Sequence, residues 1–352
     1  MRCTHGSSCT LVAILLCRDA NAQALEHEST RPVLSVHFNY AAGYVDRVIE
    51  WFTARTDLCG KHFSHCHFVQ PAKTQEVLWT AAHATKHGCP MAGLPGLFST
   101  HACLAQVMEF VARRAAAAPS GYLLLQDDVL IVRSIPVLLA MLKAENSFVV
   151  PGHPRWATQN DSQAVEFPAD LRADSINDTA CSTYWNAAAK SSSLLLRTQC
   201  RTLASRLGQA PEGLRHRVLR ACGQGEPPHF ALPLAKADVF YVPRRLVGAF
   251  IEAAAAFPIG RGFGLVLCAL SERNSSRDTW RTRGRPFELL MMSKNPAAES
   301  AMQTIRVLVR APSAHRYAFL HAVKLSNGST AQLAASVYDD DHSRSSVQLQ
   351  YM

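Results

Sequence analysis

Apolar and polar residues are arranged along the chain so as to predict strands that are followed by helices. Residues 33–39 (VLSVHFN) form an apolar run rich in β-branched side chains, which is typical of a strand. Beyond it, Val45, Val48, Ile49 and Phe52 recur at helical spacing. We therefore expect a first strand and then a helix that packs against it.

The same alternation continues in the middle of the chain. An amphipathic helix is expected to begin at Ser99 or Thr100 and to end near Pro119. The next segment, Gly121–Gln126 (GYLLLQ), is almost continuously apolar, as in strands that are buried on both faces of a parallel sheet. Residues 135–143 have the pattern of a further helix, and 148–151 that of a short strand.

Two stretches lack a clear period. Residues 59–95 are expected to be irregular, because glycines and prolines mark loops in their last part. Between 152 and 233 the pattern weakens, although 197–207 and 214–222 favour helices. Order returns with a strand at 238–242, a proline and a helix, and further strands are expected at 305–309 and 317–323.

This order of elements predicts an α/β fold. We expect a single Rossmann-like domain over residues 25–335, with a mostly parallel central sheet flanked by helices. Residues 1–24 are expected to be a signal peptide or a short N-terminal anchor, and 336–352 a polar tail. A chain of 352 residues with 48% hydrophobic and 18% charged residues excludes a wholly disordered protein and a bundle of membrane spans.

Charge narrows the class of partner. Lysine and arginine exceed aspartate and glutamate, which gives a net charge of +9 and a pI near 9.1. Such a balance favours anionic partners such as phosphates, nucleotides or acidic glycans. The basic residues are dispersed rather than clustered, so nucleic-acid binding is not expected.

Three features indicate the secretory pathway. An apolar run at 11–17 precedes small residues at 20–24 that suit signal cleavage. Cleavage there leaves eight cysteines, an even number that permits disulfides, although their pairing is open. Four of the nine asparagines lie in N-x-[ST] sequons. We expect a protein of the Golgi or ER lumen or a secreted one, associated with a membrane only if the N-terminal segment is retained.

The segment most informative about chemistry is 122–129 (YLLLQDDV). It places Asp127 and Asp128 where a buried strand ends, and ligands of open α/β sheets bind at the carboxyl ends of strands. Two adjacent carboxylates suit Mg²⁺ or Mn²⁺, which could bridge to a diphosphate. The alternative is a surface turn in which both aspartates are solvated or cap the next helix.

The sequence resembles the metal-dependent nucleotide-sugar glycosyltransferases of the GT-A fold. Gln126, Asp127 and Asp128 match their strand-end DXD motif, although Gln126 departs from the usual acid at the first position. Residues 236–250 (KADVFYVPRRLVGAF) are similar to a strand-Pro-helix element of several such enzymes. Residues 317–327 (YAFLHAVKLSN) resemble their C-terminal His-x-x-Lys element.

The resemblance implies a role for each matching residue. Asp128, Asp127 and His321 would hold the metal, and Lys324 would bind the donor diphosphate. Asp127 and Asn39 are also expected to contribute to the binding of the donor. An acceptor hydroxyl would attack the anomeric carbon, and Asp238 is the candidate general base if the reaction inverts configuration.

The expected activity is therefore transfer of a sugar from a nucleotide-sugar donor, such as a UDP-sugar, to a hydroxyl of a glycan or glycoprotein. A divalent cation, Mn²⁺ or Mg²⁺, and an ammonium group would neutralise the charge that develops on the departing nucleoside diphosphate. The alternative is a secreted or luminal glycan-binding protein, or a transferase-like protein that has lost catalysis. Gln126 at the first motif position is the feature that favours this alternative.

Two weaker motifs have structural alternatives. Cys59, His62, His65, Cys66 and His67 lie close enough in sequence to bind Zn²⁺, but we favour a disulfide-bearing loop with surface histidines. The glycine-rich residues 260–264 could present backbone N–H groups to a phosphate, but a flexible loop is the preferred interpretation.

Overall fold

The computed structural model describes a set of segments that covers most of the expected domain. These are residues 31–38, 45–50, 52–53, 58–90, 99–115, 117–150, 155–156, 165–166, 202–224, 229–230, 233–234, 238–270, 288–291, 303, 307 and 317–321. The predicted signal segment and the predicted polar tail lie outside these residues.

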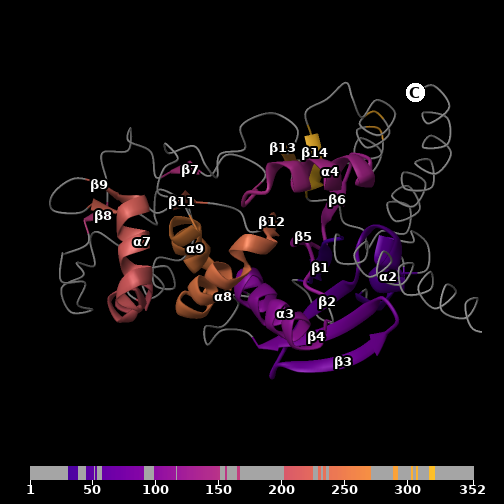
Figure 1. Cartoon of the computed structure of the whole chain (residues 1–352), viewed down its shortest axis with the longest axis horizontal. Coiled ribbons are helices and arrows are strands. Elements are labelled where there is room, and N and C mark those ends of the chain that lie inside the picture. The colour runs from indigo at the N-terminus through magenta and orange to yellow at the C-terminus, as the bar shows by residue number, and fades with distance from the viewer. Residues whose placement is uncertain are drawn as a thin grey trace, which may run out of the picture.

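A six-stranded sheet forms the centre of the molecule, in the order β12-β5-β1-β2-β4-β3 (Figure 1). The four inner strands are parallel to one another: β1 (Val33–His37), β2 (Cys66–Ala72), β4 (Ala84–Pro90) and β5 (Gly121–Gln126). The two edge strands run antiparallel to their neighbours: β3 (Glu76–Ala81) and β12 (Val239–Pro243). The predicted α/β class with a mostly parallel central sheet is thus confirmed.

Helices cover both faces of this sheet. One face is covered by α3 (Thr100–Arg114), α8 (Val247–Ala256) and α9 (Phe263–Leu270), which share one hydrophobic cluster with it (Figure 1). The other face shares a second cluster with α2 (Val45–Glu50) and α4 (Ile135–Glu145). A further helix, α7 (Glu212–Cys222), contacts α9. Among the described helices, none has the length and apolar composition that a membrane crossing requires.

Shorter elements complete the fold. A second sheet has the order β13-β14-β6 and consists of β13 (Glu288–Met291), β14 (Tyr317–His321) and β6 (Val129–Ile131). Two-residue strands form small ladders: β7 (Arg155–Trp156), β8 (Val165–Glu166), β9 (Gly223–Gln224), β10 (His229–Phe230) and β11 (Pro233–Leu234). Three short helical turns are η2 (Leu58–His62), η4 (Arg244–Leu246) and η5 (Gly260–Gly262). Residues 202–209 are also helical.

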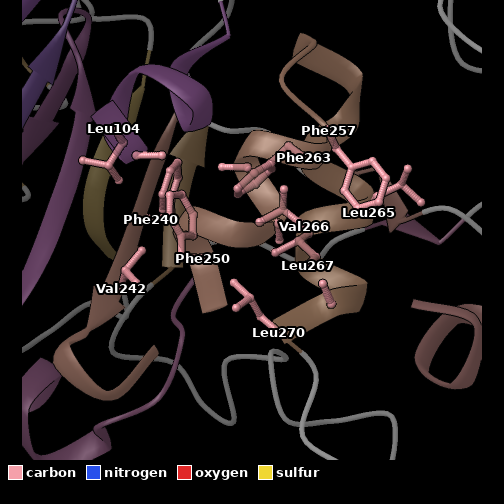
Figure 2. Packing of buried hydrophobic residues seen from close by; sticks show 14 of the residues in the cluster. Leu104, Phe240, Val242, Phe250, Phe257, Phe263, Leu265, Val266, Leu267 and Leu270 are labelled. Carbon is pink, nitrogen blue, oxygen red and sulfur yellow. The ribbon is translucent and has the colours of Figure 1, made fainter. Parts of the chain in front are cut away.

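Successive side chains of β5 point to opposite faces of the sheet and so enter both hydrophobic clusters. Leu124 lies in the cluster under α3, whereas Leu123 and Leu125 lie in the cluster on the opposite face. This is why β5 is apolar at nearly every position. On the α3 side, Figure 2 shows Phe240 of β12 beside Phe250 and Phe263, which belong to the helices that cover it.

Some sequence-based expectations about elements were wrong. The stretch 59–95, expected to be irregular, contains β2, β3 and β4. Residues 148–150, the described part of the strand expected at 148–151, form no strand, although Val149 makes an isolated bridge to Tyr241. Val307, within the strand expected at 305–309, is helical. The helix α9 was not expected, because its first turn overlaps the glycine-rich residues that favoured a loop.

Candidate functional site

Asp127 and Asp128 form the turn between β5 and β6, at the carboxyl edge of the central sheet. The backbone N–H of Asp127 donates to the carbonyl of His37, the last residue of β1, over 3.0 Å. This bond ties the acidic turn to the adjacent parallel strand. Asp127 is only 5% exposed, and the Oδ1 atoms of both aspartates are buried.

The antiparallel edge strand brings Asp238 to the same place. Because β12 runs opposite to β5, the residue that precedes β12 lies beside the end of β5. The backbone N–H of Gln126 donates to the carbonyl of Asp238 over 2.7 Å. The fold therefore brings Asp238 next to the acidic turn, from a part of the sequence more than a hundred residues away.

The second sheet brings the backbone of His321, the first residue of the His-x-x-Lys motif, beside this turn. In the antiparallel pair of β6 and β14, Val129 lies opposite His321. Val129 follows Asp128 directly, so the backbone of His321 is one register position from the acidic turn. The side chain of His321 lies outside the described part of the chain, as do Lys324 and Asn39.

The donor atoms at this edge suit a hard divalent cation in type. Two buried carboxylate oxygens from consecutive residues repel each other, and a cation between or beside them would offset that repulsion. Across the described segments, no group of three or more His, Cys, Asp or Glu side chains is arranged to hold a metal ion. A complete site would therefore need a further ligand, and the register of β14 makes His321 the candidate.

Buried histidines are the main feature that the sequence reasoning missed. His37, His67 and His101 are each at most 2% exposed. Burial lowers the pKa of His37 to about 3, with a further lowering by His87, and lowers the pKa of His101 to about 4. These imidazoles are therefore neutral at pH 7. No local pattern could have found them, because His37 and His67 are placed on the same sheet face only by the register of β1 and β2.

The cysteine-histidine motif has the disulfide that was favoured over a zinc site. Cys59 is bonded to Cys66, and a second disulfide joins Cys89 to Cys103. The expectation of surface histidines was wrong for His67, because it lies on an interior strand and faces a covering helix. Cys268 of α9 is also disulfide-bonded.

The glycine-rich residues 260–264 do not form a flexible loop. Residues Gly260–Gly262 make a 3-10 turn that leads directly into α9, whose residues are buried throughout. A Cβ at Gly262 would lie 2.3 Å from the carbonyl oxygen of Phe257. The glycine is therefore explained by a close backbone approach, without a phosphate.

The chain was also compared with known proteins. No protein-family model matches it, and no curated protein shows significant similarity to it.

Proposed function

We propose that the protein is a metal-dependent glycosyltransferase that moves a sugar from a nucleotide-sugar donor to a hydroxyl of a glycan or glycoprotein. The observation that carries the proposal is the acidic turn Asp127–Asp128 at the carboxyl edge of a mostly parallel sheet, with Asp238 beside it. That edge is where open α/β sheets bind their ligands. The disulfides Cys59–Cys66 and Cys89–Cys103 support a site of action in the secretory pathway or outside the cell.

Each residue has a defined part in this proposal. Asp128 and Asp127 hold Mn²⁺ or Mg²⁺, and His321 supplies the further ligand. The cation supplies charge neutralisation at the diphosphate of the leaving group. Lys324 contributes a second positive charge there, and Asn39 is assigned to the binding of the donor.

Asp238 is assigned to the acceptor. Its backbone carbonyl is fixed by the N–H of Gln126, so the residue is held at the edge where the acceptor hydroxyl would approach. A carboxylate in this place can take the proton from the hydroxyl as the new glycosidic bond forms. This role applies to a reaction that inverts the anomeric configuration.

The test is release of nucleoside diphosphate from a panel of nucleotide sugars, with Mn²⁺ and with a chelator, in the presence of glycoprotein acceptors. We expect release from one donor that depends on the metal. Asp128→Asn should lower it by at least about 100-fold, because the metal loses a charged ligand. The control Glu212→Gln removes an exposed acid at the start of α7 and should leave release unchanged.

A folded protein that releases nothing from any donor would contradict the proposal. The second function is a glycan-binding protein that has lost catalysis, and Gln126 in place of an acid is the observation that favours it. Binding of glycans that persists in chelator, together with no affinity for any nucleotide sugar, would support that function instead.

A further inference from the structure

Three histidines gather under the second half of α3: His67 of β2, His87 of β4 and His65, which directly precedes β2. The rings of His65 and His67 have centroids 4.8 Å apart, and those of His67 and His87 are 4.9 Å apart. The Nδ1 atom of His67 and the Nε2 atom of His87 are joined by a hydrogen bond of 2.7 Å. Phe110 of α3 meets both of these rings edge-on.

The hydrogen bond between His67 and His87 limits how many protons the pair can carry. One of the two nitrogens must donate and the other must accept. An imidazolium donates from both nitrogens, so the bond persists only while at least one of the two rings is neutral. Double protonation breaks it and places two like charges in contact.

The described residues around these three histidines add positive charge and few negative charges that could compensate for it. Arg114 of α3 lies over the ring of Phe110 at 4.2 Å and lowers the pKa of His87, after burial and His65. The other histidines near the group are His37 of β1 and His83 of the β3–β4 turn. On α3, Arg113 and Glu109 are exposed, and on β4 the ammonium of Lys86 is paired with Asp46.

Burial also disfavours the protonated forms of His67 and His87. The Nε2 atom of His67 is buried and makes no hydrogen bond to the described residues. Burial lowers the pKa of His67 well below its ordinary value and lowers the pKa of His87 to about 4. In a state in which these imidazoles are exposed to water, they take up protons near pH 6.5. Low pH therefore favours that exposed state over the folded arrangement, in which the imidazoles are buried.

We propose that His65, His67 and His87 form an acid-sensitive latch that releases the second half of α3 from strands β2 and β4. The first turn of α3 stays in place, because Cys103 is bonded to Cys89 of β4. His101 also holds that turn, through a hydrogen bond of 2.8 Å to the carbonyl of Phe257. The released part is therefore residues 107–114, which carry Phe110 and Arg114.

The test compares amide hydrogen exchange of wild type and the double variant His67→Asn/His87→Gln at equal pH, so that the intrinsic pH dependence cancels. The new amides stand where Nδ1 of His67 and Nε2 of His87 stood, so they can form the same bond without titrating. At pH 7.5 we expect equal protection of residues 107–114. At pH 5.0 they should exchange at least about tenfold faster in wild type.

If the ratio of the exchange rates of wild type and the double variant in residues 107–114 is the same at pH 7.5 and pH 5.0, the proposed latch is wrong. Acceleration of residues 107–114 in step with those of β1 and β5 would also overturn it, because that result describes global unfolding. The control His216→Gln replaces an exposed histidine of α7 and should behave as wild type.

A second pair of variants tests the latch without altering the buried histidines. Arg114→Gln removes the charge above Phe110, and Arg113→Gln removes its exposed neighbour. In Arg114→Gln, protonated His87 is repelled less, so the pH below which the amides of residues 107–114 exchange fast should fall by a few tenths of a unit. In Arg113→Gln this pH should not change. Identical onsets in these two variants would contradict the proposal.

Discussion

Phe240 is the centre of the aromatic cluster under α8 and α9, and its removal tests how rigid that core is. The side chain is fully buried, and its ring lies 5.8 Å from those of Phe148 and Phe250 and 4.9 Å from that of Phe263. These three neighbours belong to a loop and two different helices, so they cannot easily move together into a vacated space. Phe240→Ala should therefore leave a cavity.

The expected loss combines burial and the cavity. Full burial of a phenylalanine contributes about 1.5–3 kcal/mol. The cavity and the lost ring contacts raise the cost of truncation to about 3–5 kcal/mol. Phe240→Leu keeps most of the volume and should cost about 1–2 kcal/mol. The control Val137→Ala, at a position 47% exposed on α4, should cost less than about 0.5 kcal/mol.

Equilibrium urea unfolding followed by far-UV circular dichroism measures these differences, with the disulfides kept intact. With an m value of about 3 kcal/mol per molar urea, a loss of about 4 kcal/mol lowers the midpoint by roughly 1.3 M. A loss below about 1.5 kcal/mol for Phe240→Ala would refute the reasoning, because it would mean that the neighbouring rings close the cavity.

Three further predictions concern stability. Gly121→Ala should destabilise the protein by about 1–3 kcal/mol in urea unfolding, because its Cβ would lie 2.3 Å from the hydroxyl of Tyr241. Gly248→Ala has open space on α8 and should stabilise the protein by about 0.5–1 kcal/mol. Equal effects of the two substitutions would contradict the geometry. Burial lowers the pKa of His101 to about 4, below its value of about 6.5 in the unfolded chain, so its contribution is present above pH 6.5 and is lost as pH falls through 4. The stability advantage of wild type over His101→Gln should shrink by roughly 3 kcal/mol between pH 7 and pH 4 in urea titrations at each pH, and a constant difference would refute it. Cys89→Ala/Cys103→Ala should lower the free energy of unfolding by about 3 kcal/mol, as calorimetry or urea can measure, and an unchanged value would show that the disulfide does not constrain the unfolded chain.

The elements that were predicted well are those whose side chains follow one simple period. The strand β5 is apolar at nearly every position, and α3 carries an apolar face with helical spacing. The strands β2 and β4 were missed because they contain histidine, lysine, glycine and proline among their apolar residues. Those residues are accommodated by partners from other strands and helices, and such partners cannot be recognised in a local pattern.

The candidate site was predictable in part for the same reason. Asp127 and Asp128 follow an evident strand, so their place at a sheet edge could be expected. The proximity of Asp238 could not, because it depends on β12 joining the sheet antiparallel to β5. The histidines under α3 required the register of β1, β2 and β4, which only the folded chain defines.

The pairing of β5 with β12 has a consequence for biosynthesis. On the ribosome, β5 emerges more than a hundred residues before the strand that covers its free edge. During that interval a strongly apolar strand exposes unpaired N–H and C=O groups, which invites association with other nascent chains. Production of the folded protein should therefore depend on chaperones that shield this edge until residue 243 has been translated.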